Sequence, residues 1–400
     1  MAEANNKAMN DLRIGVIGVG NIGSAHTNCL LSGKIKGACL GAICDINTDR
    51  CLHFTKDNPN LKSFSDYREL IASGLCDAVI VSVPHPLHAD IAADCLNAGL
   101  HVLVEKPEDI RVTKARYLND VAAKSGKTFA IMFNQRTNPL FIKARDMVKN
   151  GELGELKRTV WIITTWYRSQ AYYDSGSWRA TWNGEGGGVL LNQAPHNLDL
   201  WQWICGMPIQ ITAFCDEAKY HNIEVEDDVT IFARYANGAT GAFMTSTGEL
   251  PGTNRLEICG TKGKIVLENE VLKWWRLPRD EREICATEKS SFPNAKCEYE
   301  EIHFDNSGSA HAGVIQAYVN NILDGTPLVA NGYEGINELS ISNAAYLSQW
   351  LGNKPIDLPF DEPLFDELLA KKATLSQSAK TEGDKKINEE YRQRWQTNWN

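Results

Sequence analysis

This 400-residue sequence has no long apolar run, no excess of positive charge and no tryptophan in its first 160 residues. No segment approaches the roughly 18 consecutive apolar residues that a membrane-spanning helix requires. Lysine and arginine number 41 against 50 acidic residues, a net charge of −9, which argues against nucleic-acid binding because such proteins present a basic face. The opening ten residues lack the apolar region of a secretory signal. We therefore expect a cytoplasmic protein that binds neither nucleic acid nor membranes.

Cysteine chemistry is also limited. The chain has 11 cysteines, an odd number, with no Cys-x-x-Cys pair and no Cys/His cluster at zinc-ligand spacing. This usage is typical of a reducing compartment, and we expect buried thiols and no metal site.

The first 160 residues contain no tryptophan, although the chain has 11. More than half of them fall between Trp161 and Trp203, whereas cysteines are concentrated before residue 96. A chain of 400 residues also exceeds one ordinary hydrophobic core. The two parts differ in composition, so we expect two domains, at residues 1–134 and 135–365, followed by a tail at 366–400.

The first part alternates short apolar runs with helical stretches. The runs lie at residues 13–19, 40–44, 78–83, 101–104 and 128–133. Strands that alternate with helices predict a parallel sheet covered on both faces, the α/β arrangement of a Rossmann domain.

The second part has a different pattern, with seven β-rich runs between residues 156 and 276 separated in places by Gly-containing turns. Helical stretches are expected at 193–204, 312–323 and 334–351. This pattern predicts an α+β domain with a large, mostly antiparallel sheet. The polar tail carries Tyr391, Trp395 and Trp399, so it packs on its own domain or on a neighbouring subunit.

A glycine motif follows the first predicted strand directly. Gly18-Val19-Gly20-Asn21-Ile22-Gly23 has the G-x-G-x-x-G spacing, in which the three glycines allow a tight turn, close approach of a pyrophosphate and close helix–strand packing. Asp45 ends the second predicted strand, where an acidic side chain accepts hydrogen bonds from the adenosine ribose and repels a 2′-phosphate. The motif therefore predicts NAD binding rather than NADP binding, although Arg50 lies nearby.

A second motif, Glu105-Lys106-Pro107, ends the fourth main predicted strand. Pro107 stiffens the chain where it leaves the sheet. Lys106 therefore lies at the carboxyl end of a strand, the edge where open α/β sheets bind ligands. Its ammonium could hydrogen-bond a substrate hydroxyl or the cofactor ribose, or it could be an ordinary surface lysine.

With these two motifs and the segment GGGVLLNQAPHNLDL, the chain resembles the Gfo/Idh/MocA family of NAD(P)-dependent oxidoreductases from about residue 12 to 360. The resemblance implies that Lys106 positions and polarises the reacting hydroxyl, and that Glu105 and Lys106 also bind the cofactor. The stretch from Pro84 to His88 resembles a family segment beside the cofactor, in which His85 replaces an asparagine. It further implies cofactor contacts for Asn134 and Arg136 near the nicotinamide. A structural salt bridge is the alternative for Arg136.

The resemblance also assigns the segment around His196. A helix is expected to start near Asn192, which would place Asn192, His196 and Asp199 on one face. Family members carry Asp and His at the first two positions, and the histidine takes the hydroxyl proton as hydride leaves the adjacent carbon. Since Asn192 cannot act as a base, we assign proton abstraction to His196 and substrate hydrogen bonding to Asn192. An N-cap role is the alternative for Asn192, and a core histidine is the alternative for His196.

Aromatic and cationic residues upstream of this segment suit a sugar pocket. Arg168, Tyr172 and Trp178 are candidate substrate contacts, because sugar rings present apolar faces to aromatic side chains and hydroxyls to polar ones. Trp161, Trp201 and Trp203 are expected to fill the core instead.

Three functions follow. The first is an NAD-dependent dehydrogenase acting on a secondary hydroxyl of a sugar or glycoside, such as C3 of a pyranoside. The second is an NAD-dependent glycosidase that oxidises, eliminates and re-reduces, with Tyr172 or Tyr173 as an additional base. The third is a regulator without catalysis, which Lys106 and His196 argue against. A broad sheet face would also favour a homo-oligomer, a dimer or tetramer.

Overall fold

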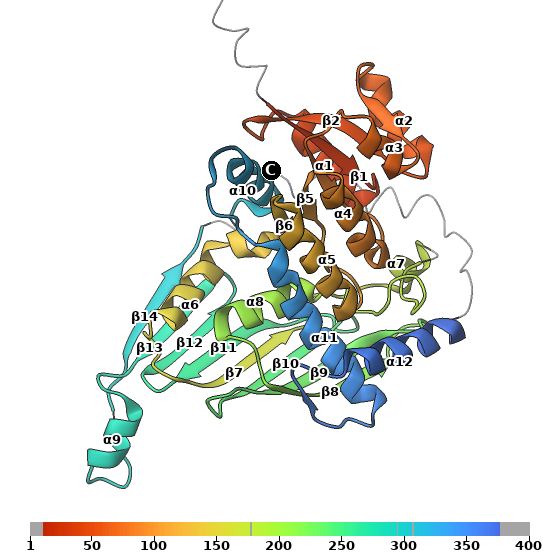
Figure 1. Cartoon of the computed structure of the whole chain (residues 1–400). Helices are drawn as coiled ribbons and strands as arrows, with labels where there is room; N and C mark the ends of the chain where they lie inside the picture. The colour runs from red at the N-terminus through yellow and green to blue at the C-terminus, as the bar shows by residue number, and fades with distance from the viewer. Residues whose placement is uncertain (1–10, 177, 294, 306–307, 377–400) are drawn as a thin grey trace, which may run out of the picture.

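The computed structural model describes residues 11–176, 178–293, 295–305 and 308–376. Within them the chain forms two sheet-based bodies, a smaller one built from the first third and a larger one built mainly from the rest (Figure 1). The predicted fold class, a Rossmann domain followed by an α+β domain, is confirmed.

The smaller body is a six-stranded parallel sheet in the order β3-β2-β1-β4-β5-β6. Its central strands are buried on both faces, which explains their continuous apolar sequences, such as the AVIV of β4. The strands are β1 (Leu12–Ile17), β2 (Ala38–Cys44), β3 (Lys62–Phe64), β4 (Ala78–Val81), β5 (His101–Val104) and β6 (Phe129–Ile131). The connecting helices are α1 (Asn21–Leu31), α2 (Thr48–Asp57), α3 (Tyr67–Ala72), η1 (His85–Leu87), α4 (His88–Asn97) and α5 (Val112–Ser125).

The larger body contains a nine-stranded sheet in the order β14-β13-β12-β11-β7-β10-β9-β8-β15. Its pairs are antiparallel except β7 with β10. The strands are β7 (Leu156–Ile163), β8 (Gln210–Glu217), β9 (Glu226–Arg234), β10 (Thr240–Ser246), β11 (Asn254–Gly260), β12 (Gly263–Glu268), β13 (Val271–Arg276), β14 (Glu298–His303) and β15 (Ile356–Asp357).

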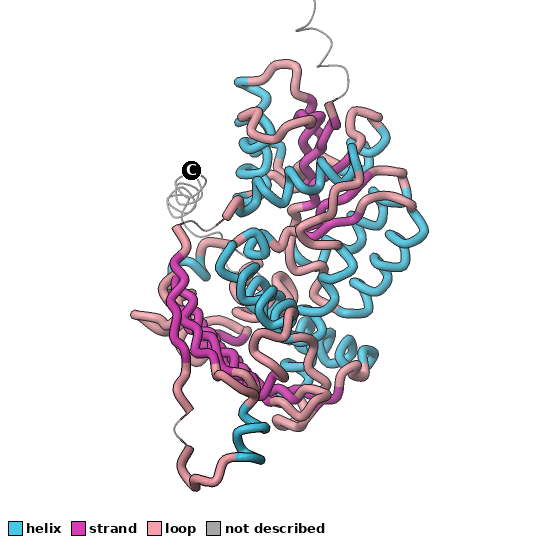
Figure 2. Tube along the Cα trace, turned by 90° about the vertical axis from the view of Figure 1, so that its left-hand side faces the viewer, coloured by secondary structure: helices cyan, strands magenta, loops and turns pink. Residues whose placement is uncertain are grey.

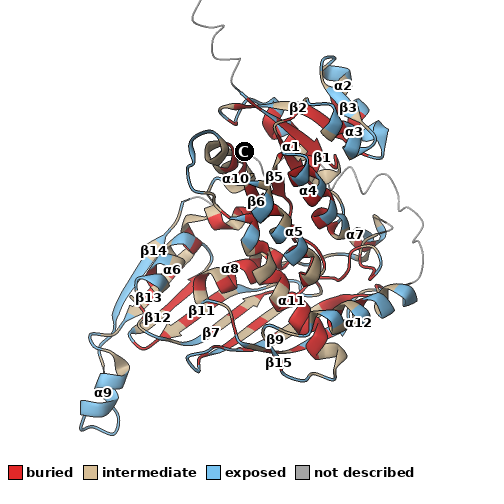
Figure 3. Cartoon of the chain, viewed as in Figure 1, coloured by how far each residue is buried: buried red, intermediate tan, exposed pale blue. Residues whose placement is uncertain are grey.

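The main helices of this body cover one face of the large sheet. Figure 2 shows the sheet nearly edge-on, with the helices between it and the smaller body. Trp161 and Trp201 are fully buried in this layer, as expected of core residues, while Phe214 and Phe232 on the opposite face are about half exposed. The helices are η2 (Asn134–Thr137), α6 (Pro139–Lys149), α7 (Gln170–Asp174), α8 (Pro195–Cys205), α9 (Glu281–Thr287), α10 (Ala310–Asp324), η3 (Gly332–Glu334), α11 (Gly335–Trp350) and α12 (Glu362–Leu375). Helix α9 projects away from the sheet and is largely exposed (Figure 3).

Helix α10 packs on the smaller body, although it follows the strands of the large sheet in the chain. Its residues Ile315 and Tyr318 are buried in the same core as Ile14 and Val16 of β1. The chain therefore returns to the smaller body after β14 and completes the large sheet with β15 only later, while the domain boundaries at 134 and 365 stay predictions.

Helix α12 crosses the predicted start of the tail at residue 366. Phe365 and Leu369 are buried against the large core, so the chain is packed at least this far. The aromatic residues Tyr391, Trp395 and Trp399 lie outside the described residues. No helix in the described ranges is both long and apolar enough to span a bilayer.

Candidate functional site

The glycine motif forms the turn between β1 and α1. Gly18 has a φ of +88°, and a Cβ on Gly23 would lie 1.8 Å from the Gly18 carbonyl oxygen, so both positions require glycine. A Cβ on Gly20, by contrast, would meet nothing within 4 Å. The fold itself therefore does not require glycine at position 20, whereas a bound group close to the backbone would. The space beside Gly20 lies at the N-terminus of α1, which begins at Asn21 and continues through Ile22.

Asp45 lies at the carboxyl end of β2 beside this turn. Its Oδ2 accepts the Val19 N–H at 2.8 Å and its Oδ1 accepts the Asn47 N–H at 2.8 Å. Arg50 forms an ion pair with it at 3.3 Å, with the arginine side chain 43% exposed. Arg50 Nη1 donates to both carboxylate oxygens, at 3.4 and 3.3 Å, so the four acceptor positions of the carboxylate are occupied and a ribose hydroxyl would take the place of this half-exposed arginine.

Glu105 and Lys106 end β5. Buried Glu105 accepts a hydrogen bond from His26 Nε2 at 2.8 Å, a contact the sequence analysis missed. Burial acts to raise the pKa of Glu105, but the hydrogen bond and charge of His26, with His311 and Lys106, lower it to about 2. Glu105 is therefore an anion that His26 and the Lys106 N–H hold in place, and its contact with the cofactor stays a prediction.

His88 joins two loops of the smaller body. Its Nδ1 lies 2.7 Å from the Pro107 carbonyl oxygen and its Nε2 lies 2.8 Å from that of Val83. It thus fixes the segment that includes Pro84 against the loop after β5. His85 lies next to it, with ring centroids 5.8 Å apart, and the His85 ring also meets the Trp178 ring edge-on at a centroid distance of 5.8 Å.

Asn134 and Arg136 lie on η2, at the junction of the two bodies. The Asn134 amide nitrogen lies 3.2 Å from His311 Nδ1. Buried Arg136 donates to both oxygens of Asp199, at 2.6 and 2.8 Å, and to Glu334 at 2.6 Å. Arg136 therefore makes the structural salt bridge given above as its alternative.

Lys106 and Asn192 meet across the junction. The Lys106 Nζ donates to the Asn192 carbonyl oxygen at 2.7 Å, and the Asn192 side-chain amide donates to Glu185. Helix α8 begins at Pro195 with Ala194 as its N-cap, so the expected start near Asn192 is wrong and Asn192 is not the cap. Proline has no N–H to donate and is tolerated in a helix only in the first turn, which is where Pro195 lies.

Glu185 is a buried carboxyl beside Asn192. It also accepts the Ala180 N–H at 2.6 Å. Burial raises the pKa of Glu185, while Arg179, these hydrogen bonds and Lys106 oppose the shift. Glu185 comes immediately before the segment GGGVLLNQAPHNLDL, and the sequence analysis assigned it no role.

His196 lies in the first turn of α8, with its ring edge-on to Phe133 at 6.5 Å. Burial lowers the pKa of His196 well below 6.5, and the positive charge of Lys106 and the nearby His311 lower it further. Its Nδ1 is buried without a hydrogen-bond partner among the described residues. The ring is therefore neutral at physiological pH, the form that accepts a proton.

Tyr172 is the centre of a polar group that includes Arg179, whose charge also acts on Glu185. Its hydroxyl accepts from Arg179 Nη1 at 2.7 Å and lies 3.3 Å from the Gln193 amide nitrogen. The guanidinium of Arg168 lies 5.0 Å from the Tyr172 ring centroid and that of Arg179 lies 4.6 Å from it. Arg179 is also 4.8 Å from the ring of Trp178, which is the residue against His85. All three predicted substrate contacts thus lie in one neighbourhood.

The smaller body fits a dinucleotide. The open space at Gly20, the helix N-terminus behind it and the acceptor Asp45 match the needs of a pyrophosphate and a ribose. Lys106, Asn134 and His196 lie at the junction, toward which the reactive end of such a cofactor would extend. Among the described residues no group of three or more His, Cys, Asp or Glu side chains could hold a metal ion.

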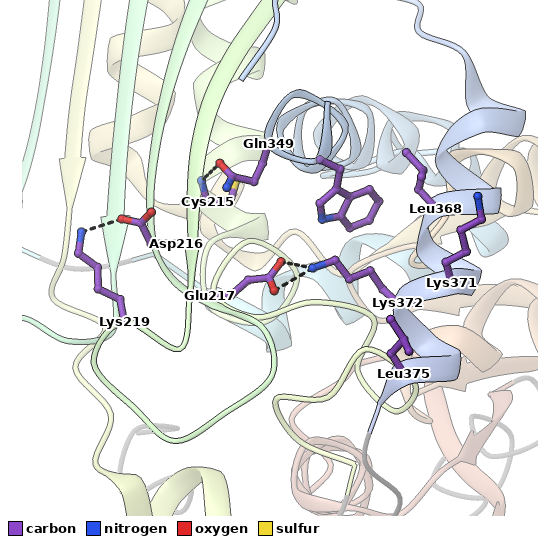
Figure 4. A pocket seen from close by; sticks show the side chains of 10 residues that line it. Cys215, Asp216, Glu217, Lys219, Gln349, Leu368, Lys371, Lys372 and Leu375 are labelled. Atoms are coloured by element: carbon purple, nitrogen blue, oxygen red, sulfur yellow. Dashed lines mark hydrogen bonds and ion pairs between the residues drawn. The ribbon is translucent and has the colours of Figure 1, made fainter. Parts of the chain in front are cut away.

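An open hollow elsewhere in the molecule is not this site. It has a volume of about 740 Å³ and lies between the end of β8, α11 and α12. Figure 4 shows Lys372 paired with Glu217 across it. None of its lining residues belongs to the cluster around Lys106, so the chemistry does not lie there.

Comparisons with known proteins agree with the two-body division. Residues 12–133 match the model of the oxidoreductase family with an NAD-binding Rossmann fold, and residues 141–266 match the GFO/IDH/MocA C-terminal domain. A myo-inositol 2-dehydrogenase of Thermotoga maritima is 26% identical over 84% of this chain and 95% of its own. A levoglucosan dehydrogenase of Pseudarthrobacter phenanthrenivorans is 25% identical over 66% and 75%.

Solved structures share the fold. The WlbA dehydrogenase from Chromobacterium violaceum, in complex with NADH and UDP-GlcNAcA, has a TM-score of 0.76 at 25% identity and covers 88% of this chain and 97% of its own. A levoglucosan dehydrogenase in complex with NADH and levoglucosan has a TM-score of 0.72 at 20% identity over 87% and 100%. The two family models together match more than half of the residues, and the second covers the segment that carries Asn192 and His196. The protein is an NAD-dependent oxidoreductase and belongs to the Gfo/Idh/MocA family.

Proposed function

We propose that the protein oxidises a secondary hydroxyl of a sugar or glycoside. The observation that carries this proposal is the meeting of Lys106, from the end of β5, with the segment of Asn192 and His196 at the junction of the bodies. A cationic donor and a neutral histidine at one point suit the removal of a hydroxyl proton. The relatives named as inositol and levoglucosan dehydrogenases support a polyol or sugar as substrate.

Each residue has a separate task. Lys106, held at 2.7 Å on the Asn192 carbonyl, places its positive charge beside the substrate oxygen and stabilises negative charge on it. His196 then accepts the hydroxyl proton, because its low pKa keeps it neutral. Asn192, oriented by Glu185, hydrogen-bonds a neighbouring hydroxyl. NAD, when bound, accepts the hydride. Holding donor and acceptor in line supplies much of the rate enhancement.

A substrate screen tests this function. The purified protein is incubated with NAD and a panel of inositols, free hexoses, anhydrosugars and glycosides, and NADH is followed by absorbance while the products are identified by mass. We expect stoichiometric NADH and a keto-sugar with at least one member. Tight NAD binding without turnover of any panel member would refute the proposal.

A glycosidase is the second candidate, favoured by a Shewanella relative named glycosyl hydrolase family 109 protein 1, which is 32% identical over 45% of this chain and 41% of its own. This reaction needs a further base for the C2 proton. Tyr173 is unsuited, because it is buried against Thr247 at 2.7 Å and burial raises its pKa. Tyr172, whose hydroxyl contacts Arg179 and Gln193, would be the base for the C2 proton instead. This reading predicts release of the aglycone, deuterium from solvent at C2 and no net NADH, whereas the dehydrogenase predicts the reverse.

A further inference from the structure

The segment that carries the candidate substrate contacts has little regular structure of its own. This substrate segment, meaning residues 166–176 and 178–182, contains Arg168, Tyr172 and Trp178. Its helix α7 has five residues, and a helix this short is not stable by itself. The place of the segment is therefore set by contacts with other parts of the chain, and the loop between β8 and β9 provides several of them.

The β8–β9 loop, residues 218–225, meets the substrate segment at two nearby points. His221 Nε2 lies 2.8 Å from the carbonyl oxygen of Arg168. The Asn222 N–H donates to Gln170 Oε1 at 2.9 Å, and the Gln170 amide nitrogen donates back to the Asn222 carbonyl oxygen at 3.2 Å. Both Gln170 and Asn222 are exposed, whereas the side chain of His221 is only 7% exposed. His221 therefore makes a buried link between the loop and the segment.

Asp227 fixes His221 and the loop around it. This fully buried residue lies at the start of β9, and its carboxylate accepts the backbone N–H groups of Lys219, Tyr220 and His221 at 3.0, 2.9 and 2.9 Å. The same carboxylate lies 2.8 Å from His221 Nδ1. Because a carboxylate and a carbonyl oxygen are both acceptors, both nitrogens of the His221 ring donate. The ring is thus held in one orientation between Asp227 and Arg168.

The backbone of Arg168 is connected to Asp227 by two routes. One route is the ring of His221, which binds the Arg168 carbonyl oxygen. In the other, the Arg168 N–H donates to the Thr247 carbonyl oxygen at 2.9 Å, and the Thr247 N–H donates to the Asp227 carbonyl oxygen at 2.9 Å. The ring of Tyr173, on α7, also packs against His221 with centroids 4.9 Å apart. A closed network of buried polar groups specifies one arrangement, because other arrangements leave some of these groups unsatisfied.

We propose that His221 is a positioning residue for the substrate segment, and that by fixing the backbone of Arg168 it sets the affinity for substrate. This inference rests on the proposed dehydrogenase, in which Arg168 and Tyr172 contact the sugar. Its partners Asp227, Arg168 and Tyr173 are not the groups that handle the hydroxyl proton. Loss of the His221 link should therefore weaken substrate binding rather than slow the chemical step.

Two amide substitutions separate the contacts of the ring. In His221→Asn the amide nitrogen takes the place of Nδ1 and keeps Asp227 but not Arg168, whereas in His221→Gln it takes the place of Nε2 and keeps Arg168. With NAD saturating and a sugar that the substrate screen identifies, KM should rise about 3- to 10-fold in His221→Asn, the worth of one hydrogen bond, while kcat stays within about twofold. His221→Gln should restore KM to within about twofold of the native value. Equal increases in both variants, no increase in His221→Asn, or a loss confined to kcat would overturn the assignment.

His303→Asn is the matched control for the substitution itself. His303 also lies beside a carboxylate, that of Glu301 at 3.6 Å, but on the edge strand β14, several strands away from β9 in the large sheet. Its KM and kcat should equal those of the native protein. A rise in KM as large as that in His221→Asn would show that the effect does not come from the link to Arg168.

Hydrogen exchange tests the position of the segment without a substrate. Followed by mass spectrometry, the amides of residues 166–176 should exchange about 3- to 10-fold faster in His221→Asn than in the native protein, and at the native rate in His221→Gln and His303→Asn. Gln170→Ala opens the neighbouring contact with Asn222 and should also speed exchange of these amides, which keeps the role of the loop testable if His221→Asn does not fold. Native exchange rates in the variants that open the contacts would refute the positioning role.

The two measurements fail separately. Absence of turnover with every sugar contradicts only the dehydrogenase, and hydrogen exchange then decides whether His221 positions the segment. Faster exchange in His221→Asn without a change in KM would overturn the effect on substrate affinity.

Discussion

The most specific prediction for a single side chain concerns His196, the proposed proton acceptor. Replacing it with alanine removes the proposed proton acceptor but leaves the glycine turn and Asp45 untouched. Turnover should fall about 10²- to 10⁴-fold, the usual worth of a positioned base, while the NAD dissociation constant stays within about twofold. Steady-state rates and NADH fluorescence titration measure the two quantities. Retained turnover would show that another group takes the proton.

The pH profile reports the same side chain. Because the pKa of His196 lies well below 6.5, first through burial and then through Lys106, the neutral form persists on acidification. The kcat/KM should therefore hold from about pH 8 through pH 6.5 and fall only below it. In Lys106→Gln the residual activity should lose rate at a higher pH, since the neighbouring positive charge is gone. An acidic limb centred above pH 6.5 in the native enzyme would contradict this account.

Alanine substitutions at Gly20 and Gly23 should affect cofactor binding and folding differently, although both residues belong to one glycine motif. Alanine at Gly20 meets no neighbour within 4 Å and adopts an ordinary φ of −70°, so the melting temperature without nucleotide should not change. Its methyl group occupies the space proposed for the pyrophosphate, and NAD affinity should fall at least about 10-fold. Alanine at Gly23 would collide with the Gly18 carbonyl and should lower the melting temperature as well. Unchanged NAD affinity in Gly20→Ala would refute the proposed approach of the phosphates.

The Arg136–Asp199 contact ties η2 to α8. In Asp199→Asn the buried guanidinium keeps Glu334 but loses its bidentate partner, and breaking buried pairs costs about 3–5 kcal/mol. We expect the lower end of that range for the free energy of unfolding, measured by urea titration. Glu367→Gln removes an exposed ion pair with Lys371 on α12 and should cost at most about 0.5 kcal/mol. Similar losses in both variants would contradict a structural role for the buried pair.

Strands and helices differed in how far the sequence revealed them. Continuous apolar runs located β1, β4 and β5, because strands buried on both faces have that composition. The short β3 and the edge strand β14, whose residues are mostly exposed, carry no such signal and were missed. The place of α10 against β1 is a matter of tertiary packing that no local pattern records.

The candidate site divides in the same way. Lys106, Asn192 and His196 follow from motifs. Glu185 and Arg179 belong to no motif and are placed by partners five to seven positions away, whereas His26 is placed by a partner distant in the chain. His26 is 79 positions from Glu105. Glu105 at the end of a buried strand needs a partner, and His26 on the helix after the glycine motif is one candidate. Sequence spacing alone does not show that the two side chains meet.

A pair of acids at the junction makes the stability of the whole molecule depend on pH. Glu108 and Glu338 are fully buried, and among the described residues neither carboxyl has a hydrogen-bond partner. Burial raises both pKa values well above 4.5; Asp109 and Glu338 add to the shift at Glu108, and Asp199 adds to that at Glu338. The folded state then holds protons that the unfolded state releases, so stability should fall as pH rises above about 4.5 toward the raised pKa values.

Glu338→Gln checks this behaviour. An amide of the same shape cannot ionise, so the penalty that grows with pH disappears. The melting temperature of the variant relative to the native protein should be higher at pH 8 than at pH 5. Glu367→Gln serves again as the exposed control, with no pH-dependent difference. A gain at pH 5 equal to that at pH 8 would show that ionisation is not the cause.

The position of α10 governs how the two bodies can move. The chain crosses between them after η2, returns before α10 and crosses again before α11. Several separate connections confine relative motion to rocking about a line that joins them, whereas a single linker would allow free rotation. Cleavage near residue 134 would not release an intact nucleotide-binding unit, because the layer that shields Ile14 and Val16 would stay with the other fragment. Helix α10 therefore ties the two bodies together, and neither body can be exchanged or deleted unless α10 stays with β1.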